Sequence, residues 1–344
     1  IILLIENYKH TKYHKFTQLL YSLKMALALI DPVSIKRTSP RKITKRVRDS
    51  KDDIKQLTTY KKLKLTKRIN YLDVKHKDLL MVTEYNDDIL KYLYSREKQI
   101  GSTDNYMRDL LSPYNFGPSM RAILIDWLIE VHQRFHYVQE TLLLAIAIMD
   151  KFLSQNLVTV SRLQLLAVTS LFIAAKYEEI KLPKLSNYSY ITDGAASAKD
   201  IKKAEAYILK SLRFDISIPN PLNFLSKSLE SGKSSSKTVQ MAKYILEHVY
   251  CCPHFIHLKP SQASKLSIYL AKQINNESLE NETKEYTDEF MDSFEELVQE
   301  ISQPSTNLEA LFGKYKEEIN GKIFQQVKDW CITHVTESKR DDPH

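Results

Sequence analysis

The run LQLLAVTSLFIAA at residues 163–175 constrains the fold more than any other part of the chain. Wound as a helix it is apolar on nearly every side, so it needs other helices around it, as in the middle of a bundle. Long runs with helical periodicity recur along the sequence, whereas alternating strand patterns are scarce. Only 6 of the 344 residues are glycine, which disfavours hairpin-rich folds and phosphate-binding loops. We therefore expect an all-α protein.

Two sets of helical patterns follow one another, with Pro219 and Pro221 between them. The third pattern of each set shares an apolar motif followed by lysine, which indicates a weak internal repeat. We expect two tandem five-helix folds and one extra helix before them, near 83–101. The expected domains are a disordered basic N-terminal region at 1–82, a first fold with its preceding helix at 83–218 and a second fold at 219–335. The expected helices of the two sets lie near 119–136, 138–154, 161–179, 184–190, 198–213, 221–230, 236–252, 260–275, 284–302 and 306–319.

The positive charge of the chain is concentrated near its N-terminus. Residues 31–80 hold 16 Lys and Arg against 6 Asp and Glu, a net charge of +10, and the remainder holds 34 against 36, a net charge of −2. A solvated, disordered tail is one explanation of this composition. The other is that KRTSPRKITKRVR (36–48) and KKLKLTKR (61–68) are nuclear-import or nucleic-acid patches. Ser39, in a Ser-Pro-x-Lys context, is a candidate phosphorylation site whose phosphate would partly neutralise these cations.

No pattern in the sequence is typical of a metal site or a catalytic centre. The three cysteines, Cys251, Cys252 and Cys331, form no CxxC motif, so neither structural zinc nor a disulfide framework is expected. His132 and His136 have the spacing of metal ligands, but HQRFH has Gln where a metalloprotease needs Glu, and no third ligand is evident. We expect no metal, no cofactor, no membrane span and no catalytic residue.

The helix expected at 119–136 raises a question, because its segment MRAILIDWL (120–128) carries two apolar stripes, whereas packing against one bundle needs only one. One stripe must face the core of the helix's own bundle, which leaves the second to be explained. The two nearly opposite stripes consist of Met120, Leu124 and Trp127, and of Ala122, Ile125 and Ile129. Arg121 lies in the same apolar segment and needs an acidic partner, because an unpaired buried charge is very costly.

Five segments together resemble the cyclin box of B-type cyclins and occur in the right order: MRAILIDWL (120–128), QETL (139–142), MDKFL (149–153), LQLLAVTSLFIAAKYEE (163–179) and ITDG (191–194). The resemblance extends more weakly through PNPLNFL (219–225) into a second cyclin fold. The segments KLPKLSNYSYITDGAASAKDIKKAEAYIL and YCCPHFIHL (250–258) are most similar to the S-phase B-type cyclins of budding yeasts.

This resemblance implies a regulatory subunit and not an enzyme. Such a chain binds and activates a cyclin-dependent serine/threonine kinase, recruits its substrates and controls the cell cycle at S phase or the G1–S transition, with G2–M as a further option. ATP and Mg²⁺ would belong to the kinase. The expected location is the nucleus, and also the cytoplasm.

The resemblance also assigns roles to single residues, first on a kinase-binding surface. Lys176 and Glu205 would form the pair that hydrogen-bonds the kinase. Apolar and aromatic neighbours would complete this surface: Tyr177, Phe214 and Ile216, flanked by Tyr85, Ile89 and Tyr92 of the preceding helix. The ordinary alternative for the pair is a surface ion pair that contributes less than about 1 kcal/mol.

A second implied site is a docking patch for Arg-x-Leu peptides of substrates and inhibitors, formed by a stripe that stays partly exposed. Its residues are Met120, Ile123, Leu124, Trp127, Glu130 and Gln164, with Asp193 at the rim. A leucine anchor needs an apolar slot and an arginine needs an acid such as Glu130. The residues alone favour the simpler view that Trp127 belongs to the core. For Arg121 the resemblance implies a structural ion pair with Asp150.

Two rival readings compete with a kinase regulator. Transcription factors with two cyclin-like repeats bind nucleic acid, but they usually carry an N-terminal zinc ribbon, and this chain has no cysteine before Cys251. Their basic residues also lie on the folded repeats, which are near neutral here, so we expect no direct nucleic-acid contact. A free-standing enzyme is disfavoured by the missing catalytic pattern.

Overall fold

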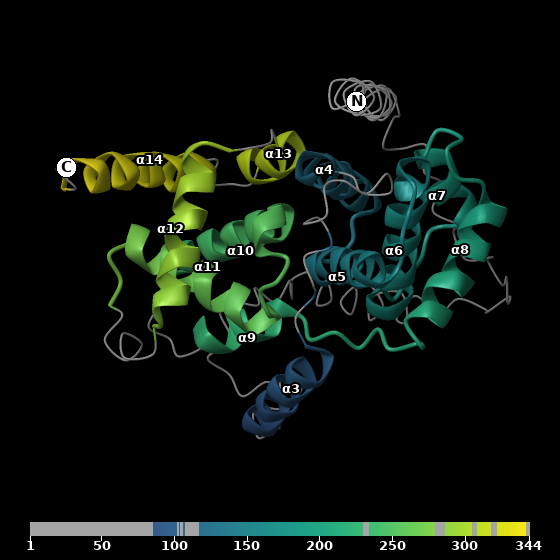
Figure 1. Cartoon of the computed structure of the whole chain (residues 1–344), viewed down its shortest axis with the longest axis horizontal. Coiled ribbons are helices and arrows are strands. Elements are labelled where there is room, and N and C mark those ends of the chain that lie inside the picture. Colours follow the sequence, from purple (N-terminus) through teal and green to yellow (C-terminus); the bar gives the residue numbers. More distant parts are fainter. Residues whose placement is uncertain are drawn as a thin grey trace, which may run out of the picture. The chain divides into compact units, whose positions relative to one another are not determined.

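The computed structural model describes residues 85–101, 103, 106, 117–229, 234–278, 286–304, 308–317 and 322–341. These residues contain twelve α-helices and no strand, which confirms the all-α prediction (Figure 1). The α-helices are α3 (Asn86–Ile100), α4 (Pro118–Phe135), α5 (Gln139–Gln155), α6 (Leu163–Glu178), α7 (Leu185–Ile191), α8 (Ala198–Ser211), α9 (Pro221–Leu229), α10 (Ser236–Cys251), α11 (Pro260–Ile274), α12 (Asp288–Ser302), α13 (Glu309–Glu317) and α14 (Ile323–Asp341). Two short 3-10 helices are η3 (Val160–Arg162) and η4 (Pro253–Phe255).

Helices α4 to α8 form the first set, and α6 is its central helix. It packs against α4, α5 and α8, and every residue from 163 to 175 except Leu165 is buried. The apolar run that indicated a helix surrounded by others therefore occupies the predicted position. Ser197 begins α8 with a capping box, in which its hydroxyl accepts from the Asp200 amide while Asp200 reaches back to the Ser197 amide.

Helices α9 to α13 form the second set, and α10 and α11 are its most closely packed pair. The sequence analysis missed α14, which follows this set and packs against α10, α11, α12 and α13. Its buried residues Ile323, Val327 and Cys331 are spaced i, i+4 and i+8, a pattern that was present in the sequence.

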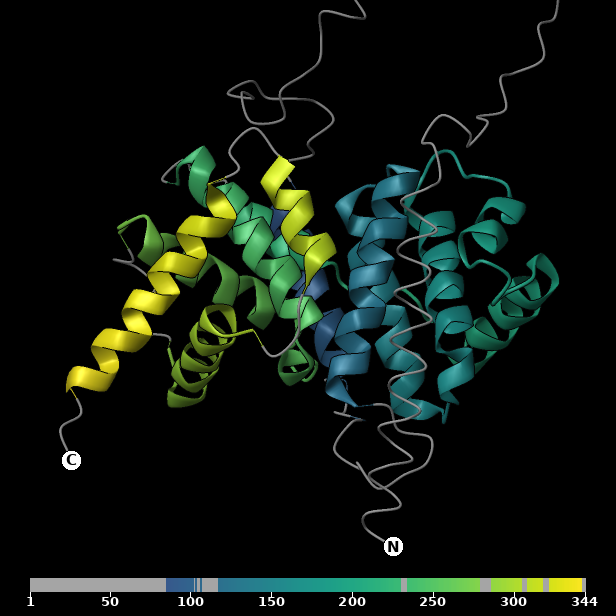
Figure 2. The ribbon, with the colours of Figure 1, turned by 90° about the horizontal axis from the view of Figure 1, so that it is seen from above.

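Helix α4 lies at the boundary between the two sets, as both ribbon views show (Figures 1 and 2). It packs on α5 and α6 of its own set and on α10, η4 and α13 of the other. Because α4 packs against helices of both sets, it needs an apolar stripe on each of two sides.

Helix α3 spans two compact units of the chain: its residues 86–91 belong to one unit and its residues 92–100 to the other. It ends at Ile100, and Gly101 follows with φ +74°, donating its N–H to the Glu97 carbonyl at 3.1 Å. Glycine suits this left-handed position because it has no Cβ. The expected apolar stripe on α3 is largely in solvent, since Ile89 and Tyr92 are exposed. The helix is held instead by Glu97, Arg96 and Tyr94, whose ring centroid lies 5.0 Å from that of Phe224.

Several expectations concern residues outside the described ranges, namely the disordered region at 1–82, its import patches and Ser39. Among the described helices none has the length and apolar character needed to cross a membrane. All three cysteines are buried free thiols, and burial raises the pKa of Cys331 to about 12.

Candidate functional site

Lys176 and Glu205 come together on the first set of helices. Lys176 lies in the last turn of α6, and its Nζ is 2.5 Å from Oε1 of Glu205 on α8. The same ammonium lies 4.4 Å from the ring centroid of Phe172, so an ion pair and a cation–π contact both fix its direction. The pair is half-open to solvent, and an open pair contributes little to stability by itself.

Apolar side chains stand exposed on the segments that follow α6 and α8. Tyr177 is exposed, Phe214 is 70% exposed, and Ile216 is half-buried against the core. Sequence reasoning missed Ile180, which is 98% exposed just after α6. A large apolar residue two positions after the end of a buried helix, with Leu182 two residues further on, was the signal that could have identified it. We call Lys176, Glu205, Tyr177, Ile180 and Phe214 the α6–α8 face.

Three residues were expected from the preceding helix as flanks of the α6–α8 face. Tyr85, Ile89 and Tyr92 are all exposed. Tyr85 and Ile89 belong to the other compact unit of the chain. Their contribution to the α6–α8 face stays a prediction.

The stripe of α4 that was expected to remain partly exposed is buried. Met120 is 5% exposed and Leu124 and Trp127 are 0% exposed, all within the main hydrophobic core. The expectation of partial exposure is therefore wrong for these three residues, because α4 packs against helices of both sets. The remaining members of the expected patch differ: Ile123 and Glu130 are half-buried, Gln164 is buried and Asp193 is exposed, with φ +48°.

Two buried polar side chains of the expected patch, Trp127 on α4 and Gln164 on α6, have unpaired atoms in the described part of the chain. The indole N–H of Trp127 and both amide atoms of Gln164 find no partner among the described residues. Leaving such groups unpaired costs about 1–3 kcal/mol each. The indole N–H could donate to a peptide carbonyl, and the Gln164 amide could both donate to a peptide carbonyl and accept from a peptide N–H.

Arg121 forms the expected ion pair with Asp150, and Tyr106 joins this pair. Its Nε and Nη2 donate to the two carboxylate oxygens of Asp150 at 3.0 and 2.6 Å, and Tyr106 donates to the same carboxylate at 2.8 Å. Burial opposes the charge of the guanidinium, but Asp150 outweighs it and raises the pKa of Arg121. Burial, then the nearby carboxylate, raises the pKa of Tyr106 well above its ordinary value.

The remaining donors of Arg121 cross from the first set of helices to the second. Nη1 donates to the Cys251 carbonyl and Nη2 to the Tyr250 carbonyl, both at 3.1 Å. The ion pair expected inside one fold is therefore also a tie between two folds. No local sequence pattern indicated Tyr106 or these carbonyls.

Asp126 makes a second tie that sequence reasoning missed. This fully buried carboxylate on α4 accepts the amides of Ala310 at 2.9 Å and Leu311 at 3.2 Å, at the start of α13. It therefore caps the N-terminus of a helix in the other set, where negative charge is favourable. Close by, Glu247 of α10 accepts from Gln139 of α5 and pairs with Lys314 of α13.

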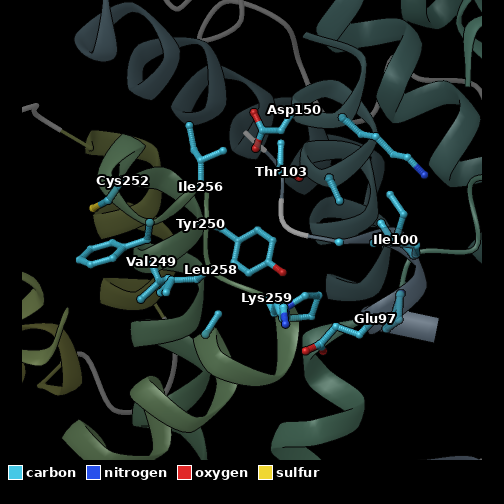
Figure 3. Close-up of a pocket in the computed structure, with 18 of the residues that line it drawn as sticks. Glu97, Ile100, Thr103, Asp150, Val249, Tyr250, Cys252, Ile256, Leu258 and Lys259 are labelled. Atoms are coloured by element: carbon cyan, nitrogen blue, oxygen red, sulfur yellow. The ribbon is translucent and has the colours of Figure 1, made fainter. Parts of the chain in front are cut away.

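A cavity of about 70 Å³ lies beside these ties, and residues of α3, α4, α5, α10, η4 and the start of α11 line it (Figure 3). Its acidic residues are already engaged: Asp150 holds Arg121, and Glu97 accepts the amide and hydroxyl of Ser261 at 3.0 and 2.6 Å. A space of this size suits a few water molecules rather than a substrate.

The histidine pair does not form a metal site. His132 is buried and its Nε2 lies 2.8 Å from the Val138 carbonyl, whereas His136 is exposed beyond the end of α4. Burial, partly opposed by this bond, lowers the pKa of His132 to about 4. In the described part of the chain no three His, Cys, Asp or Glu side chains gather in a way that could hold a metal ion.

Comparison with known proteins identifies the two sets of helices. The cyclin N-terminal domain matches residues 88–217 and the cyclin C-terminal domain matches residues 219–329. Among solved structures, a viral cyclin from herpesvirus saimiri matches with a TM-score of 0.53 and 16% identity, covering 65% of this chain and 99% of its own. That likeness concerns the fold alone.

Yeast relatives are more similar in sequence. S-phase entry cyclin-6 of Saccharomyces cerevisiae is 44% identical over 311 residues, which cover 88% of this chain and 81% of the relative. S-phase entry cyclin-5 of the same yeast is 44% identical over 274 residues, which cover 76% and 63%. The G2/mitotic-specific cyclin cdc13 of Schizosaccharomyces pombe is 35% identical over 260 residues, covering 74% and 53%. With both cyclin domains in tandem and relatives at this identity, the chain belongs to the cyclin family.

Proposed function

We propose that this cyclin is the regulatory subunit of a cyclin-dependent protein kinase and binds it through the α6–α8 face. One observation carries the proposal: the 2.5 Å pair of Lys176 and Glu205 joins α6 and α8, and large apolar side chains are exposed at or just beyond the C-terminal ends of these two helices. Apolar surface gathered around polar groups is typical of a protein interface. The pair can offer lysine donors and carboxylate acceptors to a partner's backbone.

The proposed mechanism is a shift of population in the kinase. Kinase catalysis needs a Lys–Glu ion pair and a metal-binding Asp in place together. A surface that binds only this arrangement favours it by its difference in affinity for the two states. Phosphate transfer, ATP and Mg²⁺ then belong to the kinase, and the cyclin contributes binding energy. Its relatives are named as S-phase entry and G2/mitotic-specific cyclins, which supports a role in cell-cycle progression. The nucleus is its proposed location.

The test measures phosphate transfer to a Ser-Pro-x-Lys peptide by a purified cyclin-dependent kinase, with and without the full chain. We expect strong stimulation by the chain and no transfer without the kinase. Lys176→Ala combined with Glu205→Ala should weaken both stimulation and co-purification with the kinase, while helicity is kept. His254→Ala with Glu296→Ala is the matched control, because it removes a half-exposed pair of the second fold. Equal activity of the two double variants would refute the assignment.

A second binding function is favoured by the unpaired atoms of Trp127 and Gln164. We propose that they hydrogen-bond the backbone of an Arg-x-Leu peptide, whose arginine pairs with Glu130. Since Met120, Leu124 and Trp127 are buried, the peptide would have to enter beside the half-buried Ile123 and open the stripe. A short peptide should bind at micromolar order, because its small contact must offset the cost of ordering it.

Gln164→Leu tests this docking without opening a cavity, because the side chains have similar volume. It removes unpaired buried groups, so stability should be unchanged or higher. We expect kcat/KM to fall for a substrate with an Arg-x-Leu motif and to stay the same for a peptide that lacks it. Glu130→Ala should also lower kcat/KM for the substrate with the Arg-x-Leu motif and leave kcat/KM for the other peptide unchanged. Equal kcat/KM values for both substrates in both variants would mean that this stripe is core only.

A further inference from the structure

The turn that presents Phe214 has an unusual backbone. Arg213 has φ +54° and Phe214 has φ +58°, two consecutive residues in the left-handed region. Such conformations are ordinary for glycine but strained for residues with a Cβ. Strained residues persist only where their surroundings fix them, and they cluster at functional sites.

Local hydrogen bonds account for part of this fixation. The Phe214 amide donates to the Leu209 carbonyl at 2.7 Å, and the Arg213 amide donates to the Lys210 carbonyl at 3.1 Å. These bonds end α8 but they depend on the same left-handed turn that they stabilise. A restraint from outside the turn is therefore needed to explain why it persists.

Two cations from other helices supply that restraint. Arg96 of α3 pairs with the Asp215 carboxylate and donates from Nε to the Ser217 carbonyl at 3.2 Å. Lys151 of α5 donates to the Asp215 carbonyl at 3.2 Å and lies 3.8 Å from its carboxylate. Both cations are largely covered, whereas Phe214 next to their anchor is 70% exposed.

We infer that Arg96 and Lys151 are positioning residues for kinase binding, which lock the 213–217 turn in its strained form so that Phe214 projects from the α6–α8 face. The inference rests on the proposed function of that face. Neither cation needs to touch the kinase. Without them the turn relaxes, and the binding-competent form becomes a minor population.

The test measures the cyclin concentration for half-maximal kinase stimulation, and the maximal rate, with the full chain and a Ser-Pro-x-Lys peptide. If the competent turn falls to about one tenth of the population, Arg96→Ala raises the half-maximal concentration about tenfold. The maximal rate at saturation is unchanged, because the kinase then selects the competent form. Lys98→Ala is the matched control, since it removes an exposed cation from the same helix. Lys151→Ala gives a similar shift with α3 intact, and it serves if Arg96→Ala fails to fold in a thermal melt.

Glycine at position 213 separates positioning from general stability. Arg213→Gly adopts the left-handed region without strain, so adding it to Arg96→Ala recovers much of the lost affinity, while alone it changes little. Arg96→Lys keeps the charge on Asp215 and shows a smaller loss. The inference is overturned if Arg96→Ala behaves like Lys98→Ala, or if glycine rescues nothing. Phe214→Ala distinguishes failure of the proposed face from failure of the positioning role. Normal kinase stimulation by Phe214→Ala would refute the proposed face. Reduced stimulation by Phe214→Ala together with normal stimulation by Arg96→Ala would refute only the positioning role.

Discussion

Replacing Arg121 with methionine tests how far the two folds depend on one buried cation. Arg121 is 1% exposed, and its guanidinium donates twice to Asp150 and once each to the carbonyls of Tyr250 and Cys251. Methionine fills most of its volume, so the loss is mainly electrostatic. Asp150, 7% exposed, keeps only the Tyr106 hydroxyl among the partners described above.

Breaking one side of a buried ion pair costs about 3–5 kcal/mol, because the other charge is left in a poorly solvating environment. For a folded region of this size that corresponds to a fall in Tm on the order of 10 °C. The assay is urea unfolding followed by circular dichroism. Because the cation joins both folds, we expect one cooperative transition that moves as a whole.

The companion variant is Arg121→Met with Asp150→Leu. Removing both charges abolishes the stranded carboxylate, so the double variant should be more stable than Arg121→Met alone. It should not reach the wild type, because the two carbonyls and the Tyr106 hydroxyl lose partners. A cost below about 1 kcal/mol for Arg121→Met, or a double variant less stable than the single one, would refute the reasoning.

Three further predictions concern the fold and the tail. Asp126→Ala should lower the unfolding free energy by about 2 kcal/mol, because two amides of α13 lose their cap, and Asp126→Asn should restore part of it; urea midpoints that leave Asp126→Ala unchanged would contradict the tie. Burial lowers the pKa of His132 and of His248 to about 4, so the unfolded chain binds more protons between about pH 6.5 and 4. Stability should therefore be complete above about pH 6.5 and fall by about 3 kcal/mol per histidine toward pH 4, and urea midpoints of His248→Phe should show a smaller slope against pH. Deleting residues 31–80, whose net charge is +10, should reduce nuclear accumulation of a fluorescent fusion but leave kinase stimulation in vitro intact; lost stimulation would contradict the domain boundary.

Sequence patterns correctly predicted the features that depend on neighbouring residues along the chain. The apolar run at 163–175 required a central helix, and the prolines at 219 and 221 required a break; both are present. Helix α14 was missed although Ile323, Val327 and Cys331 marked its buried side, because its sparse stripe is interrupted by charged residues.

What the sequence could not reveal are pairings between distant segments. Arg96 with Asp215, and Asp126 with the start of α13, join residues more than one hundred positions apart, and nothing near either partner identifies the other. The residues alone favoured a buried Trp127, as the structure has it, and the expectation of partial exposure came from the resemblance. What the sequence did not indicate is which helices cover this side of α4, because the exposure of one helix face depends on what another fold covers. The roles of Lys176, Glu205, Tyr177 and Phe214 on the α6–α8 face came from resemblance, that of Ile180 came from its exposure in the structure, and all of them await the kinase assays described above.

The cap that Asp126 gives to α13 has a consequence for synthesis on the ribosome. The acceptor and the first donor are 184 residues apart. At 5–20 residues per second, roughly 10–40 s pass between their translation. Throughout that interval the nascent first fold carries a carboxylate without its destined partner and an apolar helix side without its cover. Molecular chaperones would meet this cyclin at that stage, and a message that stops before the codon for Ala310 should yield a product that is rapidly degraded.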